Sequence, residues 1–324
     1  MPVTQEQATW FADAFQKLVA NIDKAIVGKS NVIRLVLTAL ISDGHVLLED
    51  YPGTGKTVLA KALANSLDGT TSRIQFTPDL MPVDLLGTSV FNPADRTFTF
   101  HPGPVFTDVL LADEINRTPP RTQSALLECM QESAATIDGV RRTISDALFV
   151  IATQNPVEFE GTYPLPEAQR DRFLLKISVP FPAAADERAM LAAYAIGRHL
   201  HDIALSGLTP VIDLTGLVAA RRALSSVIRV DEKLLDYLMA IVRATREDEA
   251  VRIGAGPRAT LSLLACSRAM ACLRGRDFVS PDDIKHLAHG VLIHRVTLTA
   301  EAEMEGVRLE DVLTRVFARI EVPR

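Results

Sequence analysis

The chain has 324 residues, a length that favours two domains over one. Hydrophobic residues make up 48% and charged residues 23%, the balance of a water-soluble globular protein. The formal net charge of −6 disfavours a protein whose main task is to neutralise nucleic-acid phosphates.

Two further features bear on the compartment. The cysteines, Cys129, Cys266 and Cys272, are odd in number and stand at no metal-ligand spacing, which indicates reduced, partly buried thiols. The N-terminus lacks the layout of a signal peptide, and no run of about 18 apolar residues offers a membrane span. A cytoplasmic protein is therefore expected.

The first 44 residues favour two helices. Thr4 and Gln7 have the spacing of a capping box, and apolar residues recur at helical spacing behind them as far as Ile22. Ser30 is expected to cap the next helix, which should end at a turn formed by Asp43 and Gly44.

A strand, a glycine-containing loop and a helix then follow in the order that a phosphate-binding loop requires. The apolar run 45–48 predicts a buried strand, and Pro52, Gly53 and Gly55 turn the chain into a helix that begins with Lys56 and Thr57. Backbone N–H groups of such a loop and the helix N-terminus attract phosphate oxygens. Lys56 would then reach the β- and γ-phosphates of ATP, and the Thr57 hydroxyl would bind Mg²⁺. One position departs from the G-x-x-x-x-G-K-[ST] pattern, because Asp50 replaces its first glycine.

The next segment, up to residue 182, predicts a parallel sheet covered by helices on both faces. Apolar runs at 109–112, 147–153 and 174–179 indicate buried strands, 73–77 a further short strand, and 124–131 a helix between them. Alternation over 89–100 predicts one hairpin, and residues 135–144, with a turn at Asp138-Gly139, predict another.

Polar residues follow three of the expected strands. They are the glycine loop, the pair Asp113-Glu114 and Asn155. Because ligands of such sheets lie at the carboxyl ends of the strands, we expect the three to converge. Asp113 would hold Mg²⁺, and Glu114 would orient and deprotonate the attacking water.

After residue 182 the composition changes, and only helices are expected. Helical patterns cover residues 186–199, 214–225, 231–246, 258–274 and 281–292, the last with Ser280 and Asp283 as a capping pair. The expected domains are 1–182, an α/β nucleotide-binding domain with the two hairpins as inserts, and 186–324, an all-helical lid.

Four segments together resemble the MoxR-type AAA+ ATPases. They are Tyr51-Pro52-Gly53-Thr54-Gly55-Lys56-Thr57, Leu111-Ala112-Asp113-Glu114-Ile115-Asn116-Arg117, Ala152-Thr153-Gln154-Asn155-Pro156 and Leu165-Pro166-Glu167-Ala168-Gln169-Arg170-Asp171-Arg172-Phe173. The resemblance covers nearly the whole chain and implies a P-loop AAA+ core with a helical lid.

The resemblance also implies residue roles. Asn155 matches the first sensor, which polarises the lytic water, and Arg172 matches the arginine finger that reaches a neighbouring subunit's γ-phosphate, although Arg170, nearby, leaves the choice of finger open. Arg258 matches the second sensor and would contact the triphosphate in cis. Lys29 receives no role. The expected nucleotide-binding residues are Val27, Gly28, Pro52, Gly53, Thr54, Gly55, Lys56, Thr57, Val58 and Arg258.

The function implied by the resemblance is that of a Mg–ATP-hydrolysing motor, a chaperone-like activator of protein partners. The family forms rings, usually hexamers, and its clients often carry a von Willebrand factor A domain. In relatives such hairpins line the face or pore of the ring. Three alternatives stay open: a motor subunit like that of magnesium chelatase, a nucleic-acid-stimulated ATPase, and a nucleotide switch that does not hydrolyse ATP. The acidic balance disfavours nucleic acid as a partner.

Overall fold

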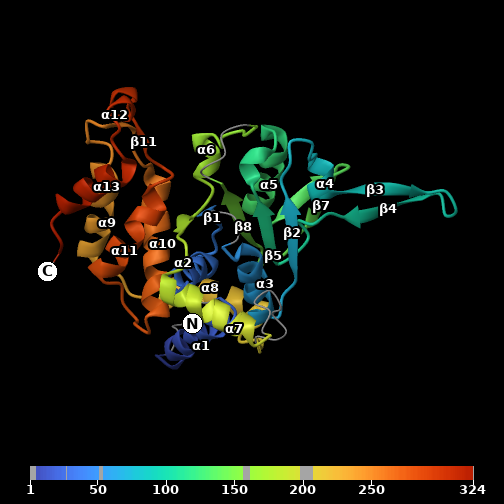
Figure 1. The fold of residues 1–324 in the computed structure, drawn as a ribbon, viewed down its shortest axis with the longest axis horizontal. Helices are drawn as coiled ribbons and strands as arrows, with labels where there is room; N and C mark the ends of the chain where they lie inside the picture. Colours follow the sequence, from blue (N-terminus) through green and yellow to red (C-terminus); the bar gives the residue numbers. More distant parts are fainter. Residues whose placement is uncertain (1–4, 27, 51–53, 156–160, 198–206, 324) are drawn as a thin grey trace.

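A computed structural model describes residues 5–26, 28–50, 54–155, 161–197 and 207–323 (Figure 1). The expected nucleotide-binding residues Val27, Pro52 and Gly53 lie outside these ranges. None of the helices among the described residues has the length and apolar character needed to cross a bilayer.

The centre of the molecule is a parallel sheet of five strands in the order β2-β5-β8-β1-β9. Its strands are β1 (Val46–Asp50), β2 (Thr71–Gln75), β5 (Val109–Asp113), β8 (Phe149–Gln154) and β9 (Leu175–Val179). All five were expected from their apolar runs, with β2 displaced by two residues towards the N-terminus. The α/β fold predicted from the sequence is therefore confirmed.

Both faces of the sheet are buried, which explains why its strands are apolar throughout. Successive side chains of a strand point to opposite faces, so Val46 and Leu48 of β1 enter one apolar core and Leu47 enters a second. Helices α2, α3 and α11 contact the first face, α1, α8 and α10 pack on these helices as a further layer, and α4 and α5 lie over the second face. The bounds of these helices are α1 (Gln5–Asp23), α2 (Ser30–Ile41), α3 (Lys56–Ser66), α4 (Pro82–Leu86), α5 (Pro120–Glu132), α8 (Leu214–Val227), α10 (Pro257–Leu273) and α11 (Pro281–Leu292).

Three residue patterns predicted where a helix starts: one is confirmed, one is wrong, and one lies partly outside the described residues. The Thr4 part of the first capping box lies outside the described residues. Ser30 does not cap α2: Lys29 occupies the cap position, and the Ser30 hydroxyl donates to Asp23 at 2.8 Å. The Ser280 signal is confirmed, because the backbone N–H of Ser280 donates to the Asp283 carboxylate at 2.9 Å where α11 begins.

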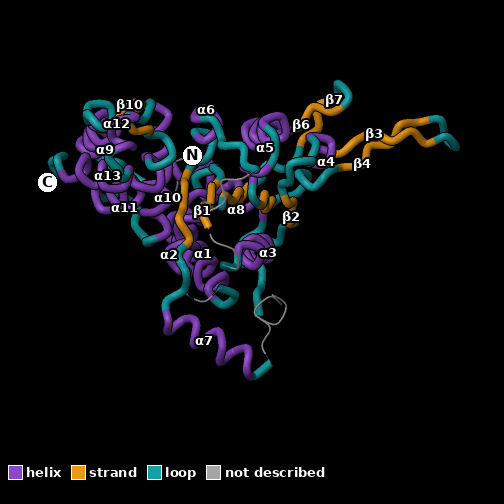
Figure 2. Tube along the Cα trace, turned by 45° about the horizontal axis from the view of Figure 1, so that its top comes forward, coloured by secondary structure: helices purple, strands orange, loops and turns teal. Residues whose placement is uncertain are grey.

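Two hairpins project beyond α5 on the same side of the molecule, as Figures 1 and 2 show. The longer hairpin joins β3 (Gly87–Asn92) to β4 (Thr97–Pro102), and the shorter one joins β6 (Ala134–Ile137) to β7 (Val140–Thr143). Both were predicted. Asp138 and Gly139 turn the shorter one with φ of 53° and 76°, the conformation that an Asp-Gly turn favours. Phe91 and Phe98 form a ring pair on the longer hairpin, where Phe98 is 72% exposed.

The chain after β9 is mostly helical, as predicted, but it also contains a short antiparallel ladder that the sequence did not indicate. Its strands, β10 (Val251–Ile253) and β11 (Thr297–Leu298), are too short to show a period. The remaining elements are η1 (Ile115–Arg117), α6 (Glu167–Arg170), α7 (Ala184–Ala195), α9 (Glu232–Ala244), α12 (Ala300–Met304) and α13 (Leu309–Ala318). Figure 2 shows α7 extending away from the rest of the molecule, and none of its residues is buried.

The α/β part and the following helices share one apolar core. Leu37 of α2, Val46 of β1 and Leu263 of α10 belong to the same cluster of buried side chains. The division at residues 182–186 thus stays a proposal based on composition and strand content, and the described halves are in extensive contact.

Candidate active site

The phosphate-binding loop leads into α3 in the way its sequence predicts. Gly55 occupies the N-cap position of α3 with a φ of 92°, a left-handed conformation that glycine adopts without strain. Lys56, Thr57 and Val58 form the first turn, where backbone N–H groups have no partner within the helix. The Val58 side chain packs in the core, so only its backbone is suited to a phosphate.

Lys56 lies beside Asp113, which ends β5. The Lys56 ammonium is 3.4 Å from Asp113 Oδ1, and both side chains are largely buried. Arg73 of β2 lies 2.7 Å from the other carboxylate oxygen, Oδ2. The glycine loop and the Asp113 carboxylate are therefore brought together, as the strand-end rule predicted.

Thr153 connects the ends of β5 and β8. Its hydroxyl donates to Asp113 Oδ1 at 2.7 Å and accepts the backbone N–H of Glu114 at 2.9 Å. Burial alone would raise the pKa of Asp113, but the hydrogen bond from Thr153 and the contacts with Arg73 and Lys56 outweigh it, and the pKa lies below its usual value. Asp113 is therefore ionised at neutral pH.

Glu114 directly follows Asp113 in a left-handed backbone conformation, with φ 58° and ψ 50°. Its carboxylate lies 3.0 Å from Nε of Arg117 in η1. Asn155 stands one residue beyond β8, the strand between β1 and β5, and is partly buried. The three strand ends singled out in the sequence are thus neighbours in the sheet.

A small apolar hollow adjoins the loop. It is lined by Ile26, Val32 and Val179 together with Gly55 and Lys56, and its free volume of about 10 Å³ holds about one water molecule. Lys29, to which the sequence assigned no role, forms part of its wall, and its ammonium donates to the carbonyl of Pro180 at 2.7 Å. As it stands, the hollow is too small for a nucleobase.

Gly28 lies at the edge of this region and contacts α7. It has a φ of 76°, and a Cβ placed on it would lie 2.3 Å from a carboxylate oxygen of Asp186. Glycine is therefore required here both by backbone conformation and by the close approach of Asp186, a contact that the sequence did not indicate.

The remaining candidates lie in and near the segment that leads into β9. The Leu174 N–H donates to the carbonyl of His45, immediately before β1, whereas the phosphate-binding loop follows the other end of β1. Arg170 ends α6, where Gln169 donates to Ser124 near the start of α5 at 3.2 Å, and Arg172 lies between α6 and Leu174. That one of these arginines acts on a neighbouring subunit stays a prediction.

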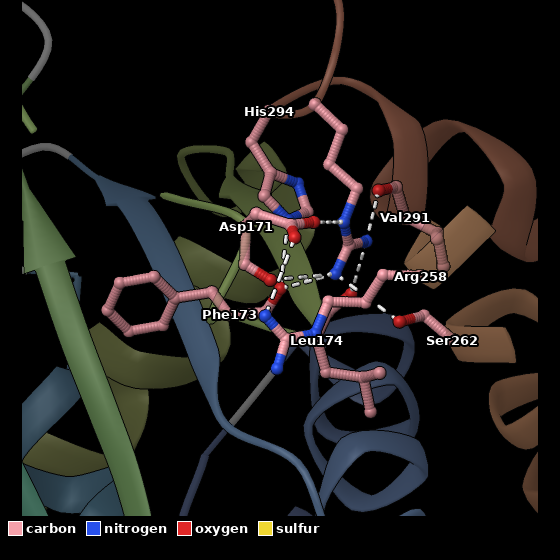
Figure 3. A network of polar contacts seen from close by, with 8 residues as sticks. Asp171, Phe173, Leu174, Arg258, Ser262, Val291 and His294 are labelled. Atoms are coloured by element: carbon pink, nitrogen blue, oxygen red, sulfur yellow. Dashed lines mark hydrogen bonds and ion pairs between the residues drawn. The ribbon is translucent and has the colours of Figure 1, made fainter. Parts of the chain in front are cut away.

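Arg258 lies close to the segment that carries Arg170 and Arg172. It is the second residue of α10, and its guanidinium lies 3.6 Å from Asp171 (Figure 3). Helix α10 packs along α1 and α2, and its first turn lies beside the segment before β9. This arrangement does not test the contact in cis that the resemblance implies for Arg258.

Comparison with known proteins agrees with this architecture. The profile of the "ATPase family associated with various cellular activities (AAA)" matches residues 45–175, and that of the "AAA lid domain" matches residues 243–316. "Chaperone MoxR1" of Mycobacterium tuberculosis is 40% identical over 95% of this chain and 82% of its own length. The chain belongs to the MoxR-type AAA+ ATPases.

Two further relatives share nearly the full length of this MoxR-type chain. The "Uncharacterized protein YeaC" of Bacillus subtilis is 44% identical over 95% of this chain and 94% of its own length. A crystal structure from Cytophaga hutchinsonii, described as a "putative ATPase", superposes with a TM-score of 0.89 at 34% identity, covering 99% of this chain and 98% of that one. The AAA core and helical lid are thus shared over the whole chain.

Proposed function

We propose that this MoxR-type chain hydrolyses Mg–ATP and uses the hydrolysis to remodel or activate protein partners. One observation carries the proposal: Lys56, Asp113 and Glu114 are assembled at the carboxyl ends of β1 and β5, and Thr153 of β8, the strand between them, joins the two acidic residues. This combination of a cation, a metal-binding carboxylate and a second carboxylate beside it suits phosphoryl transfer to water.

Each group has a task that its chemistry fits. Lys56 and the first N–H groups of α3 bind the phosphates. The Thr57 hydroxyl and the ionised Asp113 carboxylate are the hard oxygen donors that Mg²⁺ prefers, so the residues present fit this ion. Bound Mg²⁺ would supply neutralisation of charge on the β- and γ-phosphates.

Glu114 and Asn155 would act on the attacking water. The carboxylate of Glu114 accepts a proton from the water, and the Asn155 amide orients it. In this structure the Glu114 carboxylate is paired with Arg117, so it must leave that partner to accept the proton. The left-handed backbone of Glu114 turns the chain sharply at the end of β5 and sets where its side chain begins.

The positions of Arg172 and Arg258 favour assembly of the subunits into a ring. Arg258 lies 3.6 Å from Asp171, the residue that immediately precedes Arg172. We propose that both approach the nucleotide of the neighbouring subunit in a closed ring, the hexamer expected from the resemblance. A guanidinium in that place stabilises charge that grows in the transition state.

A protein client is favoured by the relative named as a chaperone and by the shape of the chain. The β3–β4 hairpin presents Val90, Phe91 and Phe98 to solvent, a small apolar surface on a projecting element. Such a surface suits contact with a polypeptide. The proposed client class is a protein with a von Willebrand factor A domain, as the family resemblance implies.

The test is phosphate release by the purified protein together with its Glu114→Gln variant. We expect the wild type to hydrolyse ATP only with Mg²⁺, and the variant to bind ATP with unchanged affinity while turnover falls about 100-fold or more. The ATP-bound variant then serves to capture clients for identification by mass spectrometry. Absence of hydrolysis by the wild type, or wild-type turnover in the variant, would overturn the assignment.

A further inference from the structure

The carboxylate of Asp171 is shared between two arginines of the lid. Its Oδ1 accepts from Nε of Arg295 at 2.7 Å, and its Oδ2 lies 3.6 Å from Nη1 of Arg258. Figure 3 shows Arg258 and Asp171 facing each other between the start of α10 and the segment that leads into β9. Asp171 immediately precedes Arg172, the candidate finger.

The two arginines are held very differently. Arg295 is 3% exposed and also donates to the carbonyls of Phe173 at 2.8 Å and Leu174 at 3.2 Å, so its position is fixed. Arg258 is 56% exposed, and its contact with Asp171 is longer than a hydrogen bond. Asp171 therefore has one permanent partner and one partner that a competing anion can detach.

The same segment is fastened to the lid at other points. Glu167 accepts from Thr297 at 2.9 Å and pairs with Arg252 at 3.2 Å. His294 contacts the carbonyl of Phe173 at 2.9 Å. The stretch that carries Arg170 and Arg172 is thus fixed by contacts from α10, β10, β11 and the turn after α11.

Positive charge accumulates around His294, which contacts the carbonyl of Phe173 in the same segment. Burial, followed by the charges of Arg295, Lys176 and Arg170, lowers the pKa of His294 well below its usual value, although its hydrogen bond with Phe173 opposes the shift. Like charges this close repel one another unless an anion lies between them. Asp171 supplies that anion for Arg295 and Arg258, whereas Lys176 is paired with Glu49 at 2.8 Å.

We propose that Asp171 is a positioning residue that holds Arg258 beside Arg172, so that the lid and the core present two guanidinium groups as a pair to the nucleotide of the next subunit. The proposal rests on the proposed ATPase function.

The test is a double-mutant cycle with Asp171→Asn and Arg258→Ala. Asn keeps the size of the side chain and a hydrogen-bond acceptor for Arg295 but removes the charge. We expect kcat to fall about tenfold or more in each single variant and hardly further in the double variant, because both changes disrupt the same pair. The affinity for ATP should stay unchanged.

Glu167→Gln is the matched control. Glu167 also fastens the segment to the lid but contacts neither Arg258 nor Arg295. We expect this variant to keep wild-type kcat, with Tm values showing that all variants are folded. Equal losses of kcat in Glu167→Gln and Asp171→Asn, or additive losses in the cycle, would overturn the positioning role.

Mixed rings provide a second readout. Lys56→Ala subunits lack a working site of their own but keep Asp171, Arg172 and Arg258. Added to Asp171→Asn subunits, they should restore part of the hydrolysis, because the damaged pair is then replaced by an intact one from the neighbour. No restoration in rings shown to be mixed would contradict the proposal, whereas a wild type without ATPase activity would instead refute the proposed function.

Discussion

The hydroxyl of Thr153 donates to the carboxylate of Asp113 at 2.7 Å, which joins the ends of two neighbouring strands at the candidate active site. The same oxygen accepts the N–H of Glu114, so one side chain fixes both acidic residues. Thr153 is fully buried, and no water competes for these bonds.

Thr153→Val should therefore impair both stability and hydrolysis. The substitution keeps the shape of the side chain but leaves the Glu114 N–H and Asp113 without their partner, at a cost of about 1–3 kcal/mol in the free energy of unfolding. We also expect kcat to fall, since the two carboxylates lose their alignment. Urea denaturation and phosphate release measure the two effects. Thr153→Ser, which keeps the hydroxyl, should resemble the wild type, and a Val variant as active as the Ser variant would contradict this role.

Arg73→Ala should lower the Mg²⁺ concentration that is needed for hydrolysis. Arg73 occupies Oδ2 of Asp113 at 2.7 Å and is half exposed, so it competes with the ion for that oxygen. An ion pair of this kind is worth up to about 1 kcal/mol, which predicts a two- to fivefold decrease in the Mg²⁺ concentration for half-maximal hydrolysis.

The matched control is Arg73→Lys, which retains the charge and should lie close to the wild type in a Mg²⁺ titration at constant ATP. A higher Mg²⁺ requirement in Arg73→Ala would show instead that the guanidinium assists the bound complex.

Arg172→Ala should abolish most hydrolysis without preventing nucleotide binding. Removal of a finger supplied by a neighbouring subunit typically lowers kcat about 1,000-fold or more. Lys56→Ala subunits with an intact Arg172 should restore part of the activity when mixed in. The same assay on Arg170→Ala decides between the two arginines, and loss of activity confined to that variant would assign the finger to Arg170.

Stability should fall between pH 6.5 and pH 4 because of His45. Its ring is buried between the carbonyl of Met130 and the N–H of Val150, which donates to Nδ1 and so needs the neutral ring. Burial lowers its pKa to about 4, against the ordinary 6.5 of the unfolded chain. The unfolded chain therefore binds the proton first as the pH falls, and up to about 3 kcal/mol present above pH 6.5 is lost by pH 4.

Urea denaturation at pH 7.5 and pH 5 checks this expectation. His45→Asn should be less stable at pH 7.5 but lose less on acidification than the wild type. His294, also buried with a lowered pKa, accounts for part of the remaining pH dependence. Identical pH dependence in the variant and the wild type would exclude His45 as a cause.

The sequence predicted the parts of the site that depend on local pattern. Apolar runs such as 109–112 indicated strands because a strand buried on both faces must be apolar, and Asp113 could be placed because it directly follows one of them. The partners of these residues could not be predicted. Arg73 reaches Asp113 through the pairing of β2 with β5, and Arg295 meets Asp171 across 124 positions of the chain. Such contacts depend on register and packing, which no local pattern specifies.

The apolar core shared by α2, β1 and α10 limits how the subunit can work. Separation of α10 from α2 and β1 would expose fully buried residues such as Leu37 and Leu263 to water. The free-energy cost would be about 2 kcal/mol for each side chain. The core and the lid should therefore move as one rigid body, and only α7 and the two hairpins should be flexible. In an assembly of such subunits, the movements that perform mechanical work have to occur at the interfaces between subunits.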